Sequence, residues 1–194
     1  STQEDAQRIL QEGIAEIAAR QAANDEEVQA NAGSIVVLDV DTFGILAAAN
    51  YPTYNLETYR EDYSTLLNDP AKPLFDRAFS GLYAPGSCFK PAVAIATLAE
   101  GVFDADDTVT CNGRYTRFTD YQPTCMGVHG ALDIREALAV SCNIYFYEAG
   151  YQLGIAPITE YANALGLGVK TGVEISEATG RISNREFVES LGNF

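Results

Sequence analysis

The sequence predicts a mostly helical α+β fold that carries one β-hairpin. Apolar residues recur at helical spacing in several segments, and two short apolar runs flank a turn near the N-terminus. Apolar residues make up 47% and charged residues 20% of the 194 positions, which is the composition of a globular chain long enough to bury a core. No internal repeat or low-complexity tract interrupts it.

The first 49 residues predict a long helix and then a hairpin. Residues 1–31 carry a loose apolar stripe at helical spacing, formed by Ile9, Leu10, Ile14, Ile17 and Val28. Residues 34–49 hold two apolar runs around the turn sequence Asp-Thr-Phe-Gly, so a β-hairpin is expected. Both runs are apolar on both faces. We therefore expect covered strands of a larger sheet, since two strands alone are marginally stable.

The middle of the chain predicts a helical region from residue 76 to residue 165. Residues 51–74 read as an irregular, tyrosine-rich connection, and residues 101–130 as a loop. Asp133 and Glu136 form a capping-box pair, which starts a helix near residue 133. Ser141-Cys142-Asn143 ends that helix or bends into the next one, at 144–153.

The last part of the chain predicts a helix, an extended segment and a final helix. Pro157 starts the first of these helices and Gly166 stops it. Residues 166–182 are extended and punctuated by glycine, and Ser183 and Glu186 cap the last helix. The chain opens in helical sequence at Ser1 and stops within another helix at Phe194, so we expect boundaries of processing or expression rather than natural termini.

Charge and hydropathy exclude several classes of function. The net charge is −15 and the isoelectric point is about 4.2. Nucleic acids and anionic membrane surfaces require a basic patch, so neither is an expected partner. No run of 18 apolar residues is present, which predicts no membrane-spanning segment in this chain and no signal peptide.

The four cysteines do not show the spacing of a metal site. None forms a Cys-x-x-Cys pair, and the chain has a single histidine, so no zinc site is expected. Cys111 and Cys125 lie in a polar segment and could form a disulfide in an exported protein, a 15-residue loop worth about 3 kcal/mol. Cys88 and Cys142 lie in apolar helical sequence and are expected to be small buried hydrophobes.

Ser87 and Lys90 are predicted to form a nucleophile and its general base. Pro85 and Gly86 break the preceding chain, Ser87 stands where an N-cap belongs, Pro91 falls in the first turn, and an apolar run follows to residue 101. Three residues apart on a helix, the serine and the lysine share one face. A lysine of lowered pKa could then take the serine proton, beside the positive end of the helix. An N-cap serine with a solvated lysine would give the same pattern.

A second motif, Ser141-Cys142-Asn143, offers a hydroxyl and a carboxamide at a bend. Ser141 could relay a proton between Lys90 and a leaving amine, and Asn143 could hold a substrate carbonyl while fixing Lys90. Taken alone, these residues are better explained as an ordinary helix cap and a satisfied hydroxyl at a helix end.

Together the two motifs identify a family resemblance. The segment Gly-Leu-Tyr-Ala-Pro-Gly-Ser-Cys-Phe-Lys-Pro at 81–91 resembles the active-site serine segment of penicillin-binding proteins. The segments at 129–130, 137–138 and 141–147 resemble their second motif and its lead-in. Residues 38–52 look like the first hairpin of their transpeptidase domain, and 165–172 like the stretch after the second motif. The match covers about residues 33–182, in family order, and looks like the monofunctional type.

The resemblance implies a serine β-lactamase and penicillin-binding-protein-like transpeptidase fold. Residues 1–194 would be the N-terminal part of that domain, made of the helix 1–31, the hairpin 34–49, the helical subdomain 76–165 and a truncated segment 166–194. The C-terminal sheet strands would be missing. It also implies a membrane anchor outside this chain, at the extracytoplasmic face of a bacterial cell.

The resemblance also implies roles for four residues. Ser87 would be the acylated nucleophile, Lys90 the general base, Ser141 the proton relay and Asn143 the substrate holder. The N–H of Ser87 would be half of the oxyanion hole. The substrate would be a peptidoglycan stem peptide ending in D-Ala-D-Ala, with β-lactams acylating the same serine. No metal or organic cofactor is implied.

The third motif of the family, Lys-Thr-Gly, lies on a sheet strand far downstream. This chain has the same letters at 170–172, only 27 residues after Asn143 (170 − 143) and within a glycine-rich segment. We therefore predict that Lys170 is not catalytic, and that the true third motif lies beyond Phe194. His129 is read as a structural hydrogen-bonding residue, because no Gly-x-Ser-x-Gly elbow accompanies it.

Two alternatives stay open. A serine β-lactamase would share both motifs, but the deacylating Glu-x-x-Leu-Asn of one common class has its nearest match at 64–68, where Ser64 replaces the glutamate. A non-catalytic scaffold or β-lactam-sensing domain of the same fold would bind a partner instead. The chain is expected to be inactive alone, and to associate with itself or with the missing part of its own domain, because its hairpin and helices would expose apolar faces.

Overall fold

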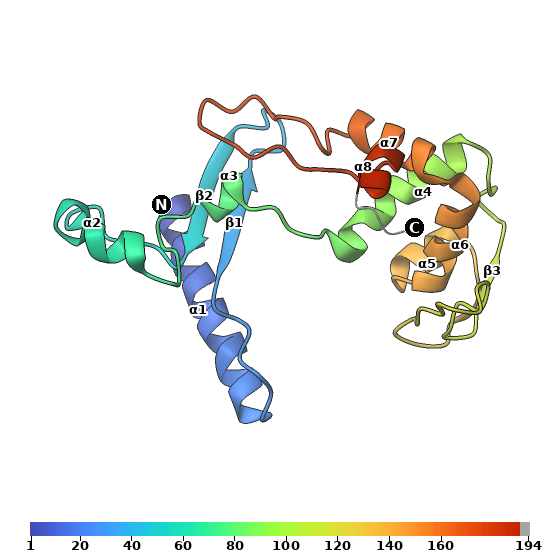
Figure 1. Ribbon diagram of the computed structural model, residues 1–194, viewed down its shortest axis with the longest axis horizontal. Coiled ribbons are helices and arrows are strands. Elements are labelled where there is room, and N and C mark those ends of the chain that lie inside the picture. The colour runs from blue at the N-terminus through green and yellow to red at the C-terminus, as the bar shows by residue number, and fades with distance from the viewer. Residues whose placement is uncertain (191–194) are drawn as a thin grey trace. The chain divides into compact units, whose positions relative to one another are not determined.

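The computed structural model describes residues 1–190, and for Arg185 and Val188 the backbone alone. The chain forms two compact units (Figure 1). The first unit consists of Ser1–Leu82 together with Val173–Ala178. The second unit consists of Tyr83–Gly172 and the chain from Thr179 onward, and it holds both predicted motifs.

The first unit begins with helix α1, Thr2–Ala23, whose start is fixed by a capping box between Ser1 and Glu4. The helix is shorter than the predicted 1–31. It ends because the chain turns back after Ala23, and the side-chain oxygen of Gln21 accepts hydrogen bonds from the backbone of residues 29 and 30. The predicted stripe is also only partly buried: Leu10 and Ile14 face inward, whereas Ile9 and Ile17 are about half exposed.

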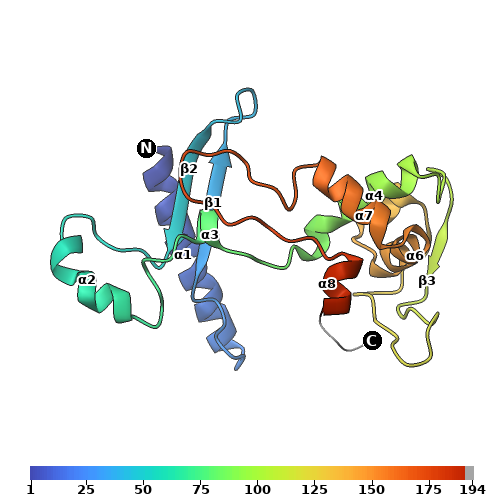
Figure 2. The same ribbon diagram turned by 45° about the horizontal axis from the view of Figure 1, so that its top comes forward.

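The predicted hairpin is present as strands β1, Gly33–Leu38, and β2, Ile45–Tyr51, paired antiparallel. Helix α1 covers one face of this sheet (Figure 2), where Ala47 and Ala49 lie against Leu10 and Ile14. The small alanines let the helix approach the strands closely. On the other side, Val36, Leu38 and Ile45 remain exposed. In residues 1–190 the sheet has two strands, so the larger sheet that we expected is not found there.

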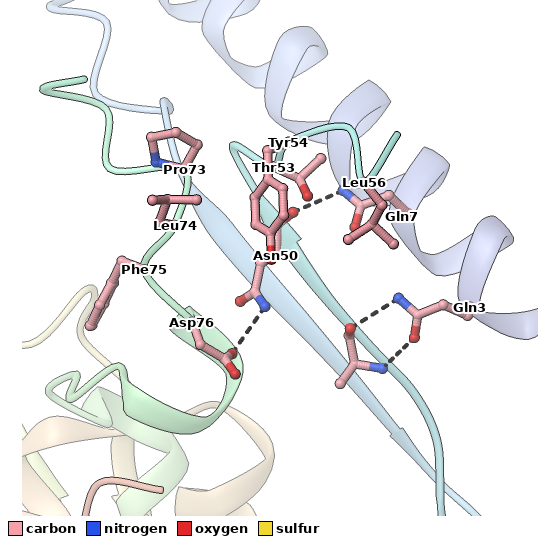
Figure 3. Close-up of a pocket in the computed structure, with 11 residues that line it drawn as sticks. Gln3, Gln7, Asn50, Thr53, Tyr54, Leu56, Pro73, Leu74, Phe75 and Asp76 are labelled. Carbon is pink, nitrogen blue, oxygen red and sulfur yellow. Dashed lines mark hydrogen bonds between the residues drawn. The ribbon is translucent and has the colours of Figure 1, made fainter. Parts of the chain in front are cut away.

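Glutamines of α1 fasten the helix to β2 through polar contacts (Figure 3). The side-chain amide of Gln3 donates to the carbonyl of Ala48 at 2.9 Å and accepts from its N–H at 2.8 Å. Gln7 donates to the carbonyl of Asn50 at 2.8 Å, and the Asn50 side chain donates to Asp76 at 3.0 Å. These residues border a pocket of about 270 Å³.

Two further helices of the first unit were not predicted as such. Helix α2, Tyr59–Asn68, lies within the segment predicted to be irregular. It has no buried residue, so it lacks the apolar stripe on which the prediction depends. Helix α3, Arg77–Ser80, is a separate short turn, and the buried Arg77 guanidinium donates to the carbonyls of residues 71, 72 and 75.

The second unit is built from helices around one core. Its elements are the 3₁₀ helix η1, Gly86–Phe89, and the helices α4, Lys90–Ala99; α5, Ile134–Ala139; α6, Asn143–Leu153; α7, Ile155–Ala164; and α8, Arg185–Ser190. Helix α4 packs against α6 and α7, and Tyr145 of α6 is completely buried. The predicted capping box of Asp133 and Glu136 starts α5. At α8, Asn184 rather than Ser183 accepts the capping hydrogen bond, from the N–H of Phe187.

A small sheet lies in the region predicted to be loop. Strands β3, Val109–Cys111, and β4, Gly130–Leu132, pair antiparallel over three residues each. Between them, residues 112–129 form a long connection in which Arg114 and Thr124 make an isolated bridge. Strands of three residues are too short for a period of two to be recognised in sequence, which is why the prediction missed them.

Candidate active site

Ser87 and Lys90 are presented by the junction of η1 and α4. Gly86 has a φ of +55°, so the chain turns sharply before the serine. The prediction that Ser87 is an N-cap was wrong: the residue lies within the 3₁₀ turn, and Lys90 begins α4 with Pro91 in its first turn. This tight turn keeps the serine exposed and places the lysine half-buried on the same side.

Ser141 and Asn143 are presented by the junction of α5 and α6. The N–H groups of Ser141 and Cys142 donate to the carbonyls of Leu138 and Ala137, the pattern of a Schellman motif. Ser141 occupies the left-handed position of that motif, at φ +52°, where glycine is usual. The next residue, Cys142, is extended and fully buried, and Asn143 begins α6. The chain therefore bends so that Ser141 and Asn143 point to the same place.

The structure brings all four predicted site residues together at the amine of Lys90. The Nζ atom lies 3.2 Å from Ser87 Oγ, 2.8 Å from Ser141 Oγ, 2.6 Å from the Ser141 carbonyl oxygen and 2.8 Å from Asn143 Oδ1. Ser141 Oγ lies a further 3.0 Å from Ser87 Oγ. The two hydroxyls and the amine thus form a closed triangle of hydrogen-bonding distances.

The hydrogen-bond donors and acceptors around Lys90 Nζ determine which proton transfers are possible. The Ser141 carbonyl and Asn143 Oδ1 can only accept, so each takes one N–H of Lys90. In the neutral amine those are both of its hydrogens, and its lone pair is left for a hydroxyl. Ser87 or Ser141 can then donate to Nζ. The geometry suits a lysine that takes a proton from Ser87 and a second serine that carries it onward.

Burial lowers the pKa of Lys90 below its ordinary value, because the charged form is poorly solvated there. The thiol groups of Cys125 and Cys142, when ionised, act in the opposite direction. Burial is the larger effect. The neutral amine that a general base requires is therefore more accessible than for a lysine in water.

Comparison with known proteins identifies the family. Residues 33–193 match the penicillin binding protein transpeptidase domain. The peptidoglycan D,D-transpeptidase MrdA of Haemophilus influenzae is 35% identical over 167 residues, which is 80% of this chain and 25% of that protein.

The chain belongs to the penicillin-binding protein transpeptidase family.

Solved structures agree with this assignment. Pseudomonas aeruginosa PBP2 in complex with WCK 5153 has a TM-score of 0.75 at 28% identity, over 92% of this chain and 41% of that one. An imipenem acyl-enzyme of Mycobacterium tuberculosis penicillin-binding protein A has a TM-score of 0.64 at 29% identity, over 76% and 38%. The similarity is to the monofunctional, class B type, as the sequence indicated. The chain spans about a quarter of the length of the MrdA proteins that it matches.

Within this penicillin-binding protein chain, Lys170-Thr171-Gly172 lies in a segment without regular structure, and Lys170 is exposed. The family motif occupies a strand, so this placement is compatible with our prediction that Lys170 is not catalytic. That prediction stays to be tested by substitution. Among residues 1–190, no helix is long and apolar enough to cross a membrane.

The structure corrects the expectations for the cysteines. Cys111 and Cys125 are free thiols rather than a disulfide, and Cys88 is exposed rather than buried. Cys142 is buried as predicted. Cys111, Cys125 and Cys142 gather with His129, and their ligand atoms all lie within 4.8 Å of one another. The spacing of these residues along the chain argued against a zinc site, but spacing alone does not show that they are close in space. The fold of β3, the loop, β4 and α6 brings the four residues together.

The pKa values of Cys125 and Cys142 are shifted in opposite directions. Burial acts to raise the pKa of Cys125, but the backbone N–H groups of Asn143, Gly127 and Ile144 stabilise its thiolate and lower the pKa to about 6. Burial raises the pKa of Cys142 to about 11. Three sulfurs and an imidazole are the donor set that zinc prefers, so these four residues could hold such an ion.

Proposed function

We propose that this chain carries the acylating centre of a serine-type D,D-transpeptidase that cross-links peptidoglycan stem peptides and is acylated by β-lactams. The observation that carries the proposal is the convergence of both motifs on Lys90, whose Nζ has four oxygen atoms of Ser87, Ser141 and Asn143 within 2.6–3.2 Å. The curated relative named above is a peptidoglycan D,D-transpeptidase, but this chain spans only part of its length.

In the acylation step, Ser87 Oγ attacks the carbonyl carbon of the penultimate D-Ala while its proton moves to Lys90 Nζ. The Ser87 N–H stabilises the oxyanion that forms. The proton then passes through Ser141 Oγ to the amine of the terminal D-Ala, the C–N bond breaks, and that residue leaves. Positions of the three groups within 3.2 Å of one another allow this transfer without large movement.

In the second step, the amine of a neighbouring stem peptide attacks the acyl-serine. It loses a proton to the same relay, a new peptide bond forms, and Ser87 regains its proton as the ester breaks. A β-lactam follows the first step only. Its leaving nitrogen stays tethered to the acyl group after the ring opens, so the adduct persists.

Asn143 has one group left for a substrate. Its Oδ1 is engaged by Lys90, while its Nδ2 donates to the Thr124 carbonyl over a long 3.3 Å. A substrate peptide carbonyl could replace that weak contact. We therefore assign substrate binding to Nδ2, and fixing of the lysine to Oδ1.

The complete site requires more than these four residues. From the family pattern we expect the third motif, with the second oxyanion N–H, in a segment beyond Phe194, and we expect the 194-residue chain to acylate poorly by itself. The missing C-terminal part of the domain would then be its first partner, covering the exposed face of β1 and β2. We place the protein at the extracytoplasmic face of the bacterial cell membrane, with other cell-wall synthesis proteins as further partners.

Labelling with a fluorescent penicillin tests the proposal. Two chain lengths are compared, the 194 residues and a chain extended beyond Phe194, each with a Ser87→Ala control whose folding is checked by circular dichroism. Labelling of the extended chain that disappears with Ser87→Ala is the expected result. Strong labelling of the short chain would instead make Lys170 a candidate for the third motif.

The same experiment separates the alternatives. A penicillin adduct that persists for hours indicates a transpeptidase, whereas turnover within minutes indicates a serine β-lactamase. A folded extended chain that does not label at all would favour a non-catalytic scaffold.

A further inference from the structure

We propose that an aromatic surface beside the candidate active site binds the glycan strand to which a stem peptide is attached. The aromatic surface consists of the exposed side chains of Tyr147 and Tyr151 on α6 and of Phe118 and Tyr121 in the 112–129 connection. All four residues belong to the second unit. The choice of ligand rests on the transpeptidase function proposed above, whereas binding of sugar to this surface can be measured without it.

The rings form a continuous row. The buried ring of Tyr115 joins them, because its centroid lies 5.8 Å from that of Tyr147 and 6.2 Å from that of Phe118. The Phe118 ring lies 5.6 Å from the ring of Tyr151. Burial raises the pKa of Tyr147, and the nearby phenol of Tyr121 acts in the same direction. Single exposed apolar residues are common, but a contiguous exposed patch marks a binding surface.

Polar contacts hold the aromatic surface in one arrangement. Tyr115 donates to the Glu148 carboxylate at 2.7 Å, and Arg117 pairs with the same carboxylate at 3.0 Å. The Arg117 guanidinium also lies over the Tyr151 ring, 3.9 Å from its centroid. These contacts fasten the 112–129 connection to α6, so little conformational freedom is lost when a ligand binds.

The chemistry of the aromatic surface suits a sugar. A pyranose ring presents C–H groups on its faces and hydroxyl groups around its edge, so it can lie on an aromatic ring while its edge forms hydrogen bonds. Three of the four exposed rings are tyrosines, whose phenols can donate or accept at that edge. A surface meant for hydrocarbon would lack these polar atoms.

The aromatic surface starts at the residue to which we assign substrate binding. Asn143, Tyr147 and Tyr151 follow one another at intervals of four residues on α6, so they share one side of the helix. Tyr145 and Ala149 point to the core instead. At 1.5 Å per residue, Tyr147 and Tyr151 lie about 6 Å and about 12 Å from Asn143 along the helix axis.

This spacing fits a substrate that extends from the scissile bond to its sugar. A stem peptide of about four residues before that bond spans at most about 14 Å. With the scissile carbonyl at Ser87 and a peptide carbonyl at Asn143 Nδ2, the sugar at the far end of the peptide comes within reach of Tyr151. The 112–129 connection also contacts Asn143 directly, through the Thr124 carbonyl at 3.3 Å. The aromatic surface is therefore continuous with the substrate site.

Sugar binding is tested on the 194-residue chain by saturation-transfer NMR, with an oligomer of N-acetylglucosamine as the probe. The wild type should bind at millimolar sugar, whereas Tyr121→Ala and Tyr151→Leu should weaken binding at least about fivefold. Tyr151→Leu keeps apolar area but removes the flat ring. Tyr63→Ala is the matched control and should bind as the wild type does, because Tyr63 is an exposed tyrosine of α2 in the first unit.

Two outcomes would overturn the sugar site. One is a wild-type chain that shows no saturation transfer at millimolar sugar, and the other is an equal loss of binding in Tyr63→Ala. Circular dichroism checks the folding of each variant. If Tyr151→Leu does not fold, Tyr121→Ala decides the result, because the Tyr121 side chain is 71% exposed and its removal leaves the core intact.

Selectivity is tested on the chain length that labels with penicillin. The release of D-Ala is compared for a glycan-linked stem peptide and for the same peptide without sugar. The wild type should favour the linked peptide at least about tenfold in kcat/KM, through a lower KM, because the sugar adds binding away from the reacting bond. Tyr121→Ala should lose most of this preference, and Tyr63→Ala should keep it.

The alternatives give different results in the same assay. Equal use of both substrates by the wild type would overturn the glycan as the ligand. An equal loss on both substrates in Tyr121→Ala would also overturn it, and would assign the aromatic surface to the stem peptide. No release of D-Ala and no labelling by any form, with sugar binding intact, would count against the proposed transpeptidase function and would still support the sugar site.

Discussion

The hydroxyl of Ser141 offers the sharpest test of the proton relay. In Ser141→Ala the hydroxyl is lost, but the Ser141 carbonyl at 2.6 Å and Asn143 Oδ1 at 2.8 Å still hold Lys90. The lysine can therefore still take the proton of Ser87, yet it has no route to the leaving amine. General acid–base groups contribute about 10²–10⁴-fold to rate, so acylation should slow by that factor, or about 3–5 kcal/mol in activation free energy.

A second substitution at position 141 separates the loss of the proton relay from any change in stability, because the backbone there is strained. At φ +52° a residue other than glycine is strained by about 1–2 kcal/mol. Glycine relieves the strain but loses about 0.5–1 kcal/mol through the greater freedom of its unfolded chain. Ser141→Gly should therefore be about 0.5–1 kcal/mol more stable than Ser141→Ala. Both variants lack the hydroxyl, so they should show the same catalytic defect.

The assay combines two measurements on the chain length that labels with penicillin. Second-order rate constants of acylation are compared for wild type, Ser141→Ala and Ser141→Gly, and urea unfolding gives the free energies of all three. Equal slowing of both variants, with a difference between their stabilities, supports the relay. Less than a tenfold loss in Ser141→Ala would refute it, and would leave direct transfer from Lys90 as the mechanism.

Three further predictions concern single groups. Burial lowers the pKa of Lys90, and a general base must be neutral. The acylation rate should therefore rise with pH through that lowered pKa and then level off. A rate that stays flat between pH 6 and about 10 would contradict the assignment of Lys90 as the general base. Tyr115→Phe removes a 2.7 Å hydrogen bond to the Glu148 carboxylate and should lower the free energy of unfolding, measured in urea, by about 1.5–3 kcal/mol. Tyr121→Phe is the control and should change it little, because Tyr121 is exposed. Arg77→Lys should lower the free energy of unfolding by about 2–3 kcal/mol, because an ammonium cannot reach the three carbonyls that the buried guanidinium binds. An unchanged midpoint in urea unfolding would show that these hydrogen bonds contribute nothing to stability.

Local signals in the sequence were sufficient for several features. The hairpin followed from its two apolar runs around a turn, and α5 from the capping pair Asp133 and Glu136. The bend at Ser141 was also foreseen. Each of these depends on neighbouring residues, so a short window of sequence contains the necessary information.

Other features depended on contacts that sequence alone does not display. The end of α1 at Ala23 depends on Gln21 binding a returning chain, and the exposure of Cys88 depends on a 3₁₀ turn in place of a regular helix start. Helix α2 carries no buried residue, so no apolar stripe in the sequence indicated a helix there.

The sequence by itself was enough to predict which groups would do the chemistry. Ser87, Lys90, Ser141 and Asn143 were proposed from two short motifs, because each motif is held within one local turn. Only the tertiary structure decided how the motifs meet at Lys90 Nζ, and only it revealed Cys111, Cys125, His129 and Cys142 as one cluster. The physical reason is separation along the chain: the packing of α4 against α6 and the pairing of β3 with β4 set these distances, and neither is encoded in any local pattern.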